Sequence, residues 1–420
     1  MSGVLNCLGY PLRASFSTQK PWRSAENFRT LKPGTAHATL RALAAADRFA
    51  RSAKLSGAPH SLGANLARGP GRSSFRTAAV PTEASEQAEE LTDFICDSPI
   101  LAAASISEGA VRSNADEWLR LGRKICGVLG FSFDALGESE RLRCYQYYLP
   151  VYMWLVEQLR AHREQQPGRP LVLGISAPQG CGKTTLVTCL QELMALEGLR
   201  AATISIDDFY LTHSALSEVS RRQEGNRLLK YRGNAASHDL ELGTSTLRKL
   251  CEADGAVAVP RYDKSMHSGL GDRAPESEWP VVEGPLDVVL FEGWMLGFRP
   301  QPDEAVAAVD EDLVPVNRAL RGYEDAWDSW INSWLVVRVD DPQCVYEWRL
   351  QAEKEMRATG KAAMSDEQVA DFVSRFMPAY KAYLPALYGE GPTTSRPGST
   401  LVIQVDERRS PVRDQPAPIT

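Results

Sequence analysis

The chain has 420 residues, of which 43% are hydrophobic and 24% charged, and its net charge is −6. These values are typical of a soluble globular protein, and no apolar stretch reaches the roughly 18 residues that a membrane span requires. The composition therefore excludes a membrane-spanning protein. The length predicts one large domain with a smaller helical attachment.

Charge is unevenly distributed along the chain. The first 80 residues contain 12 Lys and Arg but only two acids, Glu26 and Asp47, a balance of +10, whereas the remainder carries −16. A basic, Ser- and Ala-rich beginning is typical of an organelle transit peptide. A disordered basic arm for nucleic acid is the alternative, but the acidic body would repel a polyanion. We therefore expect residues 1–80 to be a transit peptide, and we expect no nucleic-acid partner.

The next segment, residues 85–168, has helical spacing of apolar residues and an aromatic stretch from Tyr145 to Trp154, which we interpret as core. A Pro- and Gly-containing turn then leads into a domain of residues 169–406, and the Pro- and Arg-rich residues 407–420 are interpreted as a loose tail. The eight cysteines form neither a CxxC pair nor a Cys/His cluster, which predicts reduced thiols and no zinc site.

Within the domain of residues 169–406, short and continuously hydrophobic segments alternate with amphipathic ones. The expected strands are 171–175, 201–206, 287–291, 334–339 and 400–405, and a helix is expected over 183–196. Continuously apolar strands are typical of a parallel sheet that helices cover on both faces. The pattern predicts a doubly wound α/β fold.

A phosphate-binding motif, A-x-x-x-x-G-K-T, runs from Ala177 to Thr184 between the first strand and the helix, where a Walker A loop must lie. Lys183 would bridge the β- and γ-phosphates and Thr184 would hold Mg²⁺, so ATP and Mg²⁺ are the expected cofactors. Ala177 replaces the usual first glycine, which we interpret as tolerated because two later glycines supply the turn. The predicted nucleotide site is Ala177, Pro178, Gln179, Gly180, Cys181, Gly182, Lys183, Thr184 and Thr185.

The role of Cys181 stays open. It contributes its backbone to the loop, but the helix N-terminus could also lower its thiol pKa and make it oxidisable.

Acidic residues follow two further strands. Asp207 and Asp208 follow the strand at 201–206, and Glu292 follows the strand at 287–291, so all three are expected at the carboxyl edge where α/β sheets bind ligands. Glu292 is in the position of a Walker B acid and, with Thr184 and Asp208, is a predicted Mg²⁺ ligand. A solvated carboxylate for Glu292, and a helix N-cap for one of the two aspartates, are the alternatives.

Four longer segments complete the pattern: RGNAASHDLEL at 232–242, VPRYDKSMHSGLGDR at 259–273, EGPLDVVLFEGWMLGFRP at 283–300 and FVSRFMPAYKAYLPALY at 372–388. With the P-loop and DDFY at 207–210, they resemble the plant-type D-glycerate 3-kinases. These belong to the P-loop superfamily of uridine kinase, pantothenate kinase and phosphoribulokinase. The similarity covers about residues 98–406.

The resemblance implies phosphorylation of D-glycerate by ATP to 3-phosphoglycerate, in photorespiration in the chloroplast stroma. We expect a monomer that acts on a small molecule and has no membrane partner.

The resemblance also implies roles for individual residues. Asp207 would be the general base, at the first Asp of the family's D-x-F-[YH] motif, while Asp208, pointing the other way along the strand, would cap or orient. A glycerate carboxylate favours an Arg fork. The predicted substrate contacts are Arg232, His238, Arg261, Lys264, His267 and Arg273. Which arginine holds the carboxylate stays open, and either histidine could instead be structural.

A helical lid is expected after residues 334–339. Arg349 and Arg357 resemble the lid arginines of related kinases and lie about 80° apart around a helix, so both could face the nucleotide and act in catalysis. Pairing with Glu353 and Glu355 is the alternative.

Two competing functions remain. Another acceptor, such as uridine, pantothenate or ribulose 5-phosphate, would keep the same chemistry. A nucleotide-driven switch or assembly ATPase would use ATP for conformational change instead. The chain lacks a guanine-reading N-K-x-D segment and has the acceptor-side DDFY, and both observations weigh against a switch.

Overall fold

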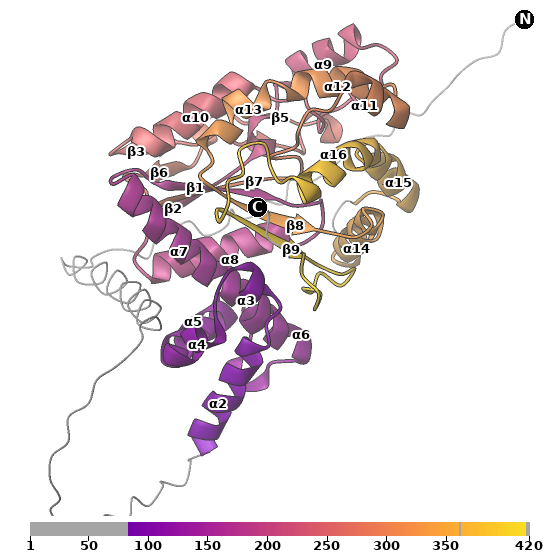
Figure 1. The fold of residues 1–420 in the computed structure, drawn as a ribbon. Helices are drawn as coiled ribbons and strands as arrows, with labels where there is room; N and C mark the ends of the chain where they lie inside the picture. Colours follow the sequence, from indigo (N-terminus) through magenta and orange to yellow (C-terminus); the bar gives the residue numbers. More distant parts are fainter. Residues whose placement is uncertain (1–82, 361–362, 417–420) are drawn as a thin grey trace, which may run out of the picture.

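The computed structural model of the chain describes residues 83–360 and 363–416, so the predicted transit peptide lies outside the described residues (Figure 1). At its centre is a five-stranded parallel sheet with the order β2-β7-β1-β8-β9. The strands are β1 (Leu171–Ser176), β2 (Ala201–Ser205), β7 (Val288–Gly293), β8 (Ser333–Arg338) and β9 (Thr400–Gln404). All five coincide closely with expected strands, and the predicted parallel α/β fold is confirmed.

The register of the sheet aligns the carboxyl ends of β1, β2 and β7. Glu292 of β7 lies opposite Ile175 of β1 on one side and Ser205 of β2 on the other. The phosphate-binding loop after β1 and the two aspartates after β2 therefore begin at the level of Glu292, at one edge of the sheet.

Helices cover both faces of the sheet (Figure 1). On one face lie α7 (Leu149–Gln165) and α8 (Lys183–Leu196), and on the other α10 (Leu240–Glu252) and α13 (Tyr323–Ala326). All six residues of β1 are buried, as a strand covered on both faces requires. Helix α8 has the predicted bounds.

The N-terminal helices pack beside α7 and α8 (Figure 1). They are α2 (Glu83–Cys96), α3 (Ile100–Ala103), α4 (Glu108–Ser113), α5 (Ala115–Val128), α6 (Glu138–Arg141) and the π-helix η2 (Leu142–Tyr148). Trp118 and Tyr145 are fully buried, as the core interpretation of the aromatics requires. Arg120 and Lys124 of α5 pair with Glu197, just after α8, at 2.8 and 2.6 Å, which joins this segment to the helix of the phosphate-binding loop.

The remaining elements are further helices and two short antiparallel strand pairs. The helices are η3 (Ile206–Phe209), α9 (His213–Arg222), α11 (Asp303–Val309), α12 (Leu313–Leu320), η6 (Asp328–Trp330), α14 (Cys344–Ala358), α15 (Asp366–Ser374) and α16 (Met377–Gly389). Short 3-10 helices span Phe133–Ala135, His267–Gly269 and Glu276–Glu278. The strand pairs are β3 (Ala256–Ala258) with β6 (Val281–Glu283), and β4 (Tyr262–Asp263) with β5 (Asp272–Arg273).

The segment expected as a loose tail has defined contacts as far as Gln415. Val405 pairs with Pro411 in an antiparallel bridge. The side chain of Gln415 accepts from the backbone N–H of Gln404 at 2.8 Å and donates to its carbonyl at 3.1 Å. The segment thus differs from the expectation because the open edge of β9 offers backbone groups that need partners.

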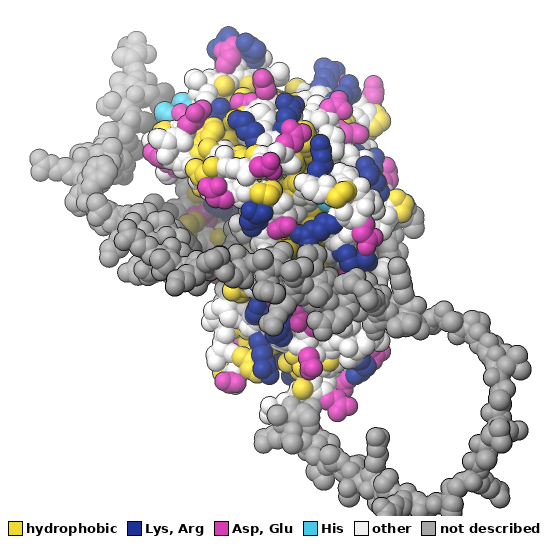
Figure 2. All heavy atoms as spheres, turned by 90° about the vertical axis from the view of Figure 1, so that its left-hand side faces the viewer, with side chains coloured by type: hydrophobic (Ala, Val, Ile, Leu, Met, Phe, Trp, Pro, Cys, Tyr) yellow, Lys and Arg dark blue, Asp and Glu magenta, His cyan; other side chains and the backbone are white. Residues whose placement is uncertain are grey.

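Membrane spans, surface charge, cysteines and metal clusters can be described for the part of the chain that the structure covers. Among the described helices, none has the length and apolar character to cross a membrane. Basic and acidic side chains are interspersed on the face that Figure 2 shows. The cysteines of the described ranges are free, and these ranges contain no cluster of three His, Cys, Asp or Glu able to hold a metal ion.

Candidate active site

The phosphate-binding loop connects β1 to α8. Gly180 and Gly182 supply its left-handed turns, with φ of 82° and 90°. Ala177 lies outside the left-handed region, and its N–H donates to Gly293 O at 3.1 Å. An alanine therefore fits there without strain. The hydroxyl of Tyr380 on α16 accepts from Gln179 N–H at 3.1 Å and braces the loop from outside.

At the start of α8, Lys183 meets the acid of β7. Its Nζ lies 3.0 Å from Glu292 Oε2, and both side chains are only 14% exposed. Burial acts to lower the pKa of Lys183, but attraction to Glu292 and to other nearby groups, including Asp207, outweighs it and raises the pKa. The lysine is therefore charged at any physiological pH, and the three residues share one electrostatic environment.

Asp207 lies on the acceptor side of this pair. Its Oδ2 is 2.6 Å from Lys264 Nζ on the β4–β5 hairpin. Burial acts to raise the pKa of Asp207, but Lys264, Lys183 and a hydrogen bond from the Tyr210 hydroxyl outweigh it and lower the pKa. Asp207 is thus an ionised carboxylate at neutral pH, as a general base must be.

Asp208 has a different environment. Its Oδ2 accepts from Ser205 N–H at 3.0 Å, which closes a capping box, and lies 3.0 Å from Arg261 Nη1. Burial raises the pKa of Asp208 to about 6, against the opposing effect of Arg261. The capping role expected for Asp208 is present. The strand does not continue to it, because the 3-10 helix η3 begins at Ile206, so the cap rather than the pleat separates the two carboxylates.

A relay of buried polar groups lies next to Asp207. The ring of His238 stacks on that of Tyr210 with centroids 4.6 Å apart. Its Nδ1 is 2.8 Å from the Tyr323 hydroxyl, which in turn accepts from Ala236 N–H at 3.3 Å. Since that hydroxyl accepts from the backbone, its own proton is available to Nδ1. On this basis we assign the ring hydrogen of His238 to Nε2, which is buried without a hydrogen-bond partner among the described residues. Burial lowers the pKa of His238 to about 4, so the ring is neutral.

The three predicted arginines all have partners within the site. Arg232 Nη1 donates to the carbonyls of Gly269, at 2.9 Å, and Leu270. Arg261 pairs with Asp208. Arg273 Nη2 donates to Asp239 at 2.8 Å, while its Nε is buried without a partner.

His267 and Tyr262 belong to the same hairpin. Nε2 of His267 lies 3.0 Å from Asp272 Oδ2, and its ring stacks on His213 with centroids 3.9 Å apart. The hydroxyl of Tyr262 is buried without a partner, and its ring lies 5.2 Å from that of Tyr210. Three polar groups near Tyr210, those of His238, Tyr262 and Arg273, are therefore unsatisfied, which is costly unless a ligand uses them.

Comparisons with known proteins agree with this geometry. Residues 172–308 match the phosphoribulokinase / uridine kinase family. A chloroplastic D-glycerate 3-kinase of Arabidopsis thaliana is 48% identical over 349 residues, which cover 81% of this chain and 76% of the relative.

The chain belongs to the D-glycerate 3-kinase family.

A solved D-glycerate 3-kinase of Cryptococcus neoformans has 35% identity and a TM-score of 0.58, covering 63% of this chain and 97% of the neighbour. An uncharacterised kinase of Schizosaccharomyces pombe, 35% identical, is matched over 97% of its own length by 61% of this chain. More than a third of this member of the D-glycerate 3-kinase family therefore has no counterpart in that fungal relative.

The two predicted lid arginines form ion pairs on α14. Arg349 pairs with Glu353, which is 1% exposed, and stacks on Phe372 at 5.4 Å. Arg357 pairs with Asp366 at 2.6 Å. In this conformation carboxylates of α14 and α15 engage both guanidinium groups, and the alternative of local pairing describes Arg349.

Cys181 is 5% exposed in the phosphate-binding loop. Burial raises the pKa of its thiol, against the lowering effect of Lys183. Burial of the thiol therefore acts against the alternative of activation by the helix N-terminus.

Sequence reasoning missed Tyr210 and Tyr323, which in this D-glycerate 3-kinase family member hydrogen-bond Asp207 and His238. Tyr210 lies inside the DDFY motif and could have been noted there. Tyr323 is 85 residues from His238 and gives no local signal.

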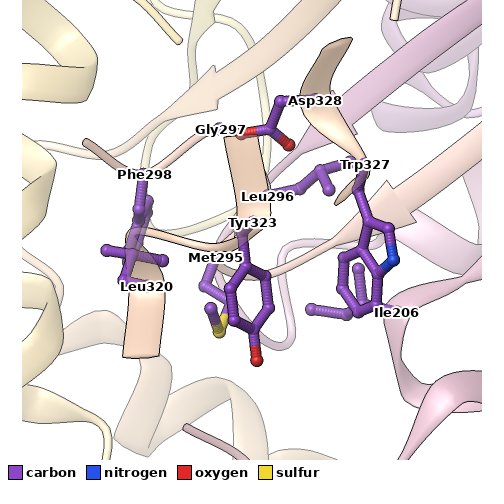
Figure 3. A pocket seen from close by; sticks show the side chains of 9 residues that line it. All are labelled: Ile206, Met295, Leu296, Gly297, Phe298, Leu320, Tyr323, Trp327 and Asp328. Atoms are coloured by element: carbon purple, nitrogen blue, oxygen red, sulfur yellow. The ribbon is translucent and has the colours of Figure 1, made fainter. Parts of the chain in front are cut away.

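A separate small pocket lies behind η3 and is mainly apolar (Figure 3). Its lining residues are Ile206, Met295, Leu296, Gly297, Phe298, Leu320, Tyr323, Trp327 and Asp328. Asp328 is 2% exposed and accepts from the Thr393 hydroxyl at 2.6 Å, while its Oδ1 has no partner. Burial raises the pKa of Asp328 to about 7.

Proposed function

We propose that this chain transfers the γ-phosphate of ATP to the 3-hydroxyl of D-glycerate, giving 3-phosphoglycerate and ADP. One observation carries the proposal. An ionised carboxylate, Asp207, lies between the Lys183–Glu292 pair of the nucleotide side and unsatisfied buried polar groups of the acceptor side. A kinase for a small polar acceptor needs this order of groups.

Asp207 is the general base in this proposal. The acceptor hydroxyl gives its proton to the Asp207 carboxylate while the hydroxyl oxygen attacks the γ-phosphate and ADP leaves. Lys264 holds Oδ2 of this carboxylate at 2.6 Å and the Tyr210 hydroxyl donates to the same carboxylate, so the base is oriented and stays ionised. Lys183 neutralises charge on the phosphates.

The acceptor pocket supplies donors for a hydroxylated carboxylate. His238 presents a neutral Nε2–H, and the Arg273 Nε–H is equally unpartnered. A carboxylate accepts from both kinds of donor, and the Arg273 guanidinium adds charge assistance. We therefore favour Arg273 for the glycerate carboxylate. Arg261 holds Asp208 instead, and Arg232 and His267 brace the hairpin that carries Lys264.

The acids of the site fit Mg²⁺. Magnesium in kinases takes one or two protein oxygens and completes its shell with phosphates and water. Thr184 follows Lys183, and Glu292 is a hard carboxylate beside it, so these two residues would hold the ion. Asp208 is a weaker candidate because its Oδ2 is already occupied by Ser205 and Arg261. Bound magnesium would neutralise charge that develops on the transferred phosphoryl group.

The lid is proposed as a moving element. In this conformation Arg349 and Arg357 pair with Glu353 and Asp366. Catalysis by either arginine requires these pairs to open when ATP binds. Opening costs little for Arg357, because its side chain and that of Asp366 are both largely exposed. Turnover within about threefold of wild type for both alanine variants would exclude the lid role, since loss of a transition-state cation costs far more.

We further propose that the protein works as a monomer in the chloroplast stroma, in photorespiration, after removal of a leader that ends between about Thr77 and Ser98. The name of the Arabidopsis thaliana relative supports the chloroplast location, and the basic composition of residues 1–80 supports the leader. A recombinant form beginning near Ala84 should keep full activity.

The decisive experiment is a coupled ADP-release screen with D-glycerate, L-glycerate, uridine, pantothenate and ribulose 5-phosphate. We expect ADP release to depend on D-glycerate and the product to be 3-phosphoglycerate. Turnover only with another acceptor would replace the substrate. ATP hydrolysis that is slow and indifferent to every acceptor would instead favour a nucleotide-driven switch.

A further inference from the structure

The turn after β9, residues 406–410, lies against the phosphate-binding loop. Nε of Arg409 donates to Gly180 O at 2.6 Å, and its Nη1 donates to Gln351 Oε1 at 3.0 Å. Its guanidinium also covers the ring of Trp348 at 5.1 Å. A residue more than two hundred positions from the loop in sequence thus makes a direct hydrogen bond to it.

The turn is built to hold Arg409 in this place. Arg409 has a φ of 66°, a left-handed conformation that a non-glycine residue adopts only when its surroundings enforce it. Asp406 enforces it, because its carbonyl accepts from Arg409 N–H at 2.9 Å and its side chain accepts from Ser410 N–H at 2.8 Å. Trp348 donates its ring N–H to Glu407 O at 2.7 Å and so anchors the turn to α14.

The contacted carbonyl belongs to a peptide unit that matters for ATP. In a trans peptide the C=O of Gly180 and the N–H of Cys181 point in opposite directions. A donor that holds the carbonyl outward therefore keeps the N–H directed into the loop, where phosphate oxygens bind. In this structure that N–H makes only a long bond of 3.4 Å, to Pro178 O, which a phosphate oxygen can readily replace.

Alternative conformations of this peptide are otherwise available. Gly180 has a φ of 82° and carries no side chain that would restrict it. A Cβ added at Gly180 would lie 2.7 Å from Trp348 Cβ, so Trp348 packs tightly against this residue of the loop. Arg409 makes the second contact to Gly180, through its carbonyl. Arg409 itself has no carboxylate within ion-pair distance among the residues that the structure describes, so the Gly180 carbonyl is a principal partner of its guanidinium.

We propose that Arg409 is a positioning residue of the ATP site, which acts through the Gly180 carbonyl to keep the Cys181 N–H directed at the phosphates. The role rests on the proposed kinase function only in that ATP is the ligand of the loop. It assigns residues 406–410 to the nucleotide site rather than to a dispensable tail.

The test compares two neutral residues of equal length. In Arg409→Gln the amide nitrogen stands at the same position along the side chain as Nε of arginine, so a donor to Gly180 O is kept. Arg409→Met keeps the length but has no donor. Arg408→Met removes the same charge from the exposed neighbouring residue and is the control. Binding of a non-hydrolysable MgATP analogue is measured by calorimetry without acceptor, and melting temperatures are recorded for all variants.

We expect Arg409→Met to weaken nucleotide binding about tenfold, as loss of a charge-assisted hydrogen bond implies, with Arg409→Gln within about threefold of wild type and Arg408→Met unchanged. The KM for D-glycerate should not change. The proposal is overturned if Arg409→Met binds like wild type, or if Arg409→Gln is as weak as Arg409→Met, since charge alone would then be responsible. Because binding is measured without acceptor, the result does not depend on D-glycerate being the substrate.

Discussion

Replacing Asp207 by asparagine separates a catalytic from a structural role for this carboxylate. Asparagine keeps the shape but cannot take the proton of the acceptor hydroxyl. Loss of a general base costs about 100- to 10,000-fold in turnover, or roughly 3–5 kcal/mol of barrier. The same change also removes the attraction to Lys264.

The structural cost of this change is much smaller. The side chains of Asp207 and Lys264 are 30% and 57% exposed, so solvent screens their attraction. A pair of this kind contributes about 0.2–1 kcal/mol to stability, which corresponds to a decrease of at most about 4 °C in melting temperature. A decrease this small leaves the enzyme folded at the assay temperature, so a 100-fold loss of turnover would report the lost base rather than unfolding.

The assay measures kcat by coupled ADP release, MgATP affinity by calorimetry and stability by thermal melting. Asp208→Asn is the matched control, because its amide oxygen can still accept from Ser205 N–H. We expect Asp207→Asn to lose at least 100-fold in kcat with MgATP affinity within about threefold, and Asp208→Asn to lose less than about tenfold. A larger loss in Asp208→Asn, with Asp207→Asn nearly active, would exchange the two roles.

Three further predictions concern the surroundings of the site. Lys264→Met removes one of the groups that offset burial, so the pKa of Asp207 rises; the acid limb of the kcat–pH profile should move to higher pH, and an unmoved limb would contradict the pairing. Tyr323→Phe removes the hydroxyl that donates to His238 Nδ1, so the ring hydrogen is no longer fixed on Nε2, where it would face the substrate. The KM for D-glycerate should therefore rise about three- to tenfold with the KM for ATP unchanged; equal changes in both would contradict the relay. The folded-state pKa of Asp328 is raised from 3.8 to about 7, so the folded state holds more protons and stability is lost as pH rises from about 4 to 7. Asp328→Asn should remove this loss of stability, which is worth at most about 4 kcal/mol. Denaturant titrations at pH 5 and 8 measure the free energy of unfolding. If the difference between the two pH values is the same in Asp328→Asn as in wild type, the reasoning fails.

The sequence predicted the central sheet well because its strands are continuously apolar, a local property. Helix α8 was equally predictable, since Gly182 and Gly198 bracket it. The turn at Asp208 was harder to predict, because its carboxylate can accept from the backbone N–H of Ser205 only where the strand ends and the 3-10 helix begins.

Long-range contacts were beyond the reach of sequence patterns. The relay from Tyr323 to His238 forms only when α13 and α10 pack together. The turn at residues 406–410 looks like a polar tail because its order comes from Trp348, Gly180 and the open edge of β9 rather than from its own composition. By contrast, the pairing of Arg349 with Glu353 has the i, i+4 spacing that sequence reasoning had weighed.

The position of this turn also bears on how the protein is made. Ribosomes release a chain from its first residue to its last, so residues 400–410 emerge after every other part of the site. Strand β9 adds to the outer edge of β8, so the other four strands can associate before it arrives. The phosphate-binding loop, however, meets Arg409 only when synthesis has passed that residue. A nascent chain arrested shortly before it would contain every acceptor-side group and the Lys183–Glu292 pair of the nucleotide side, yet its loop would lack this contact.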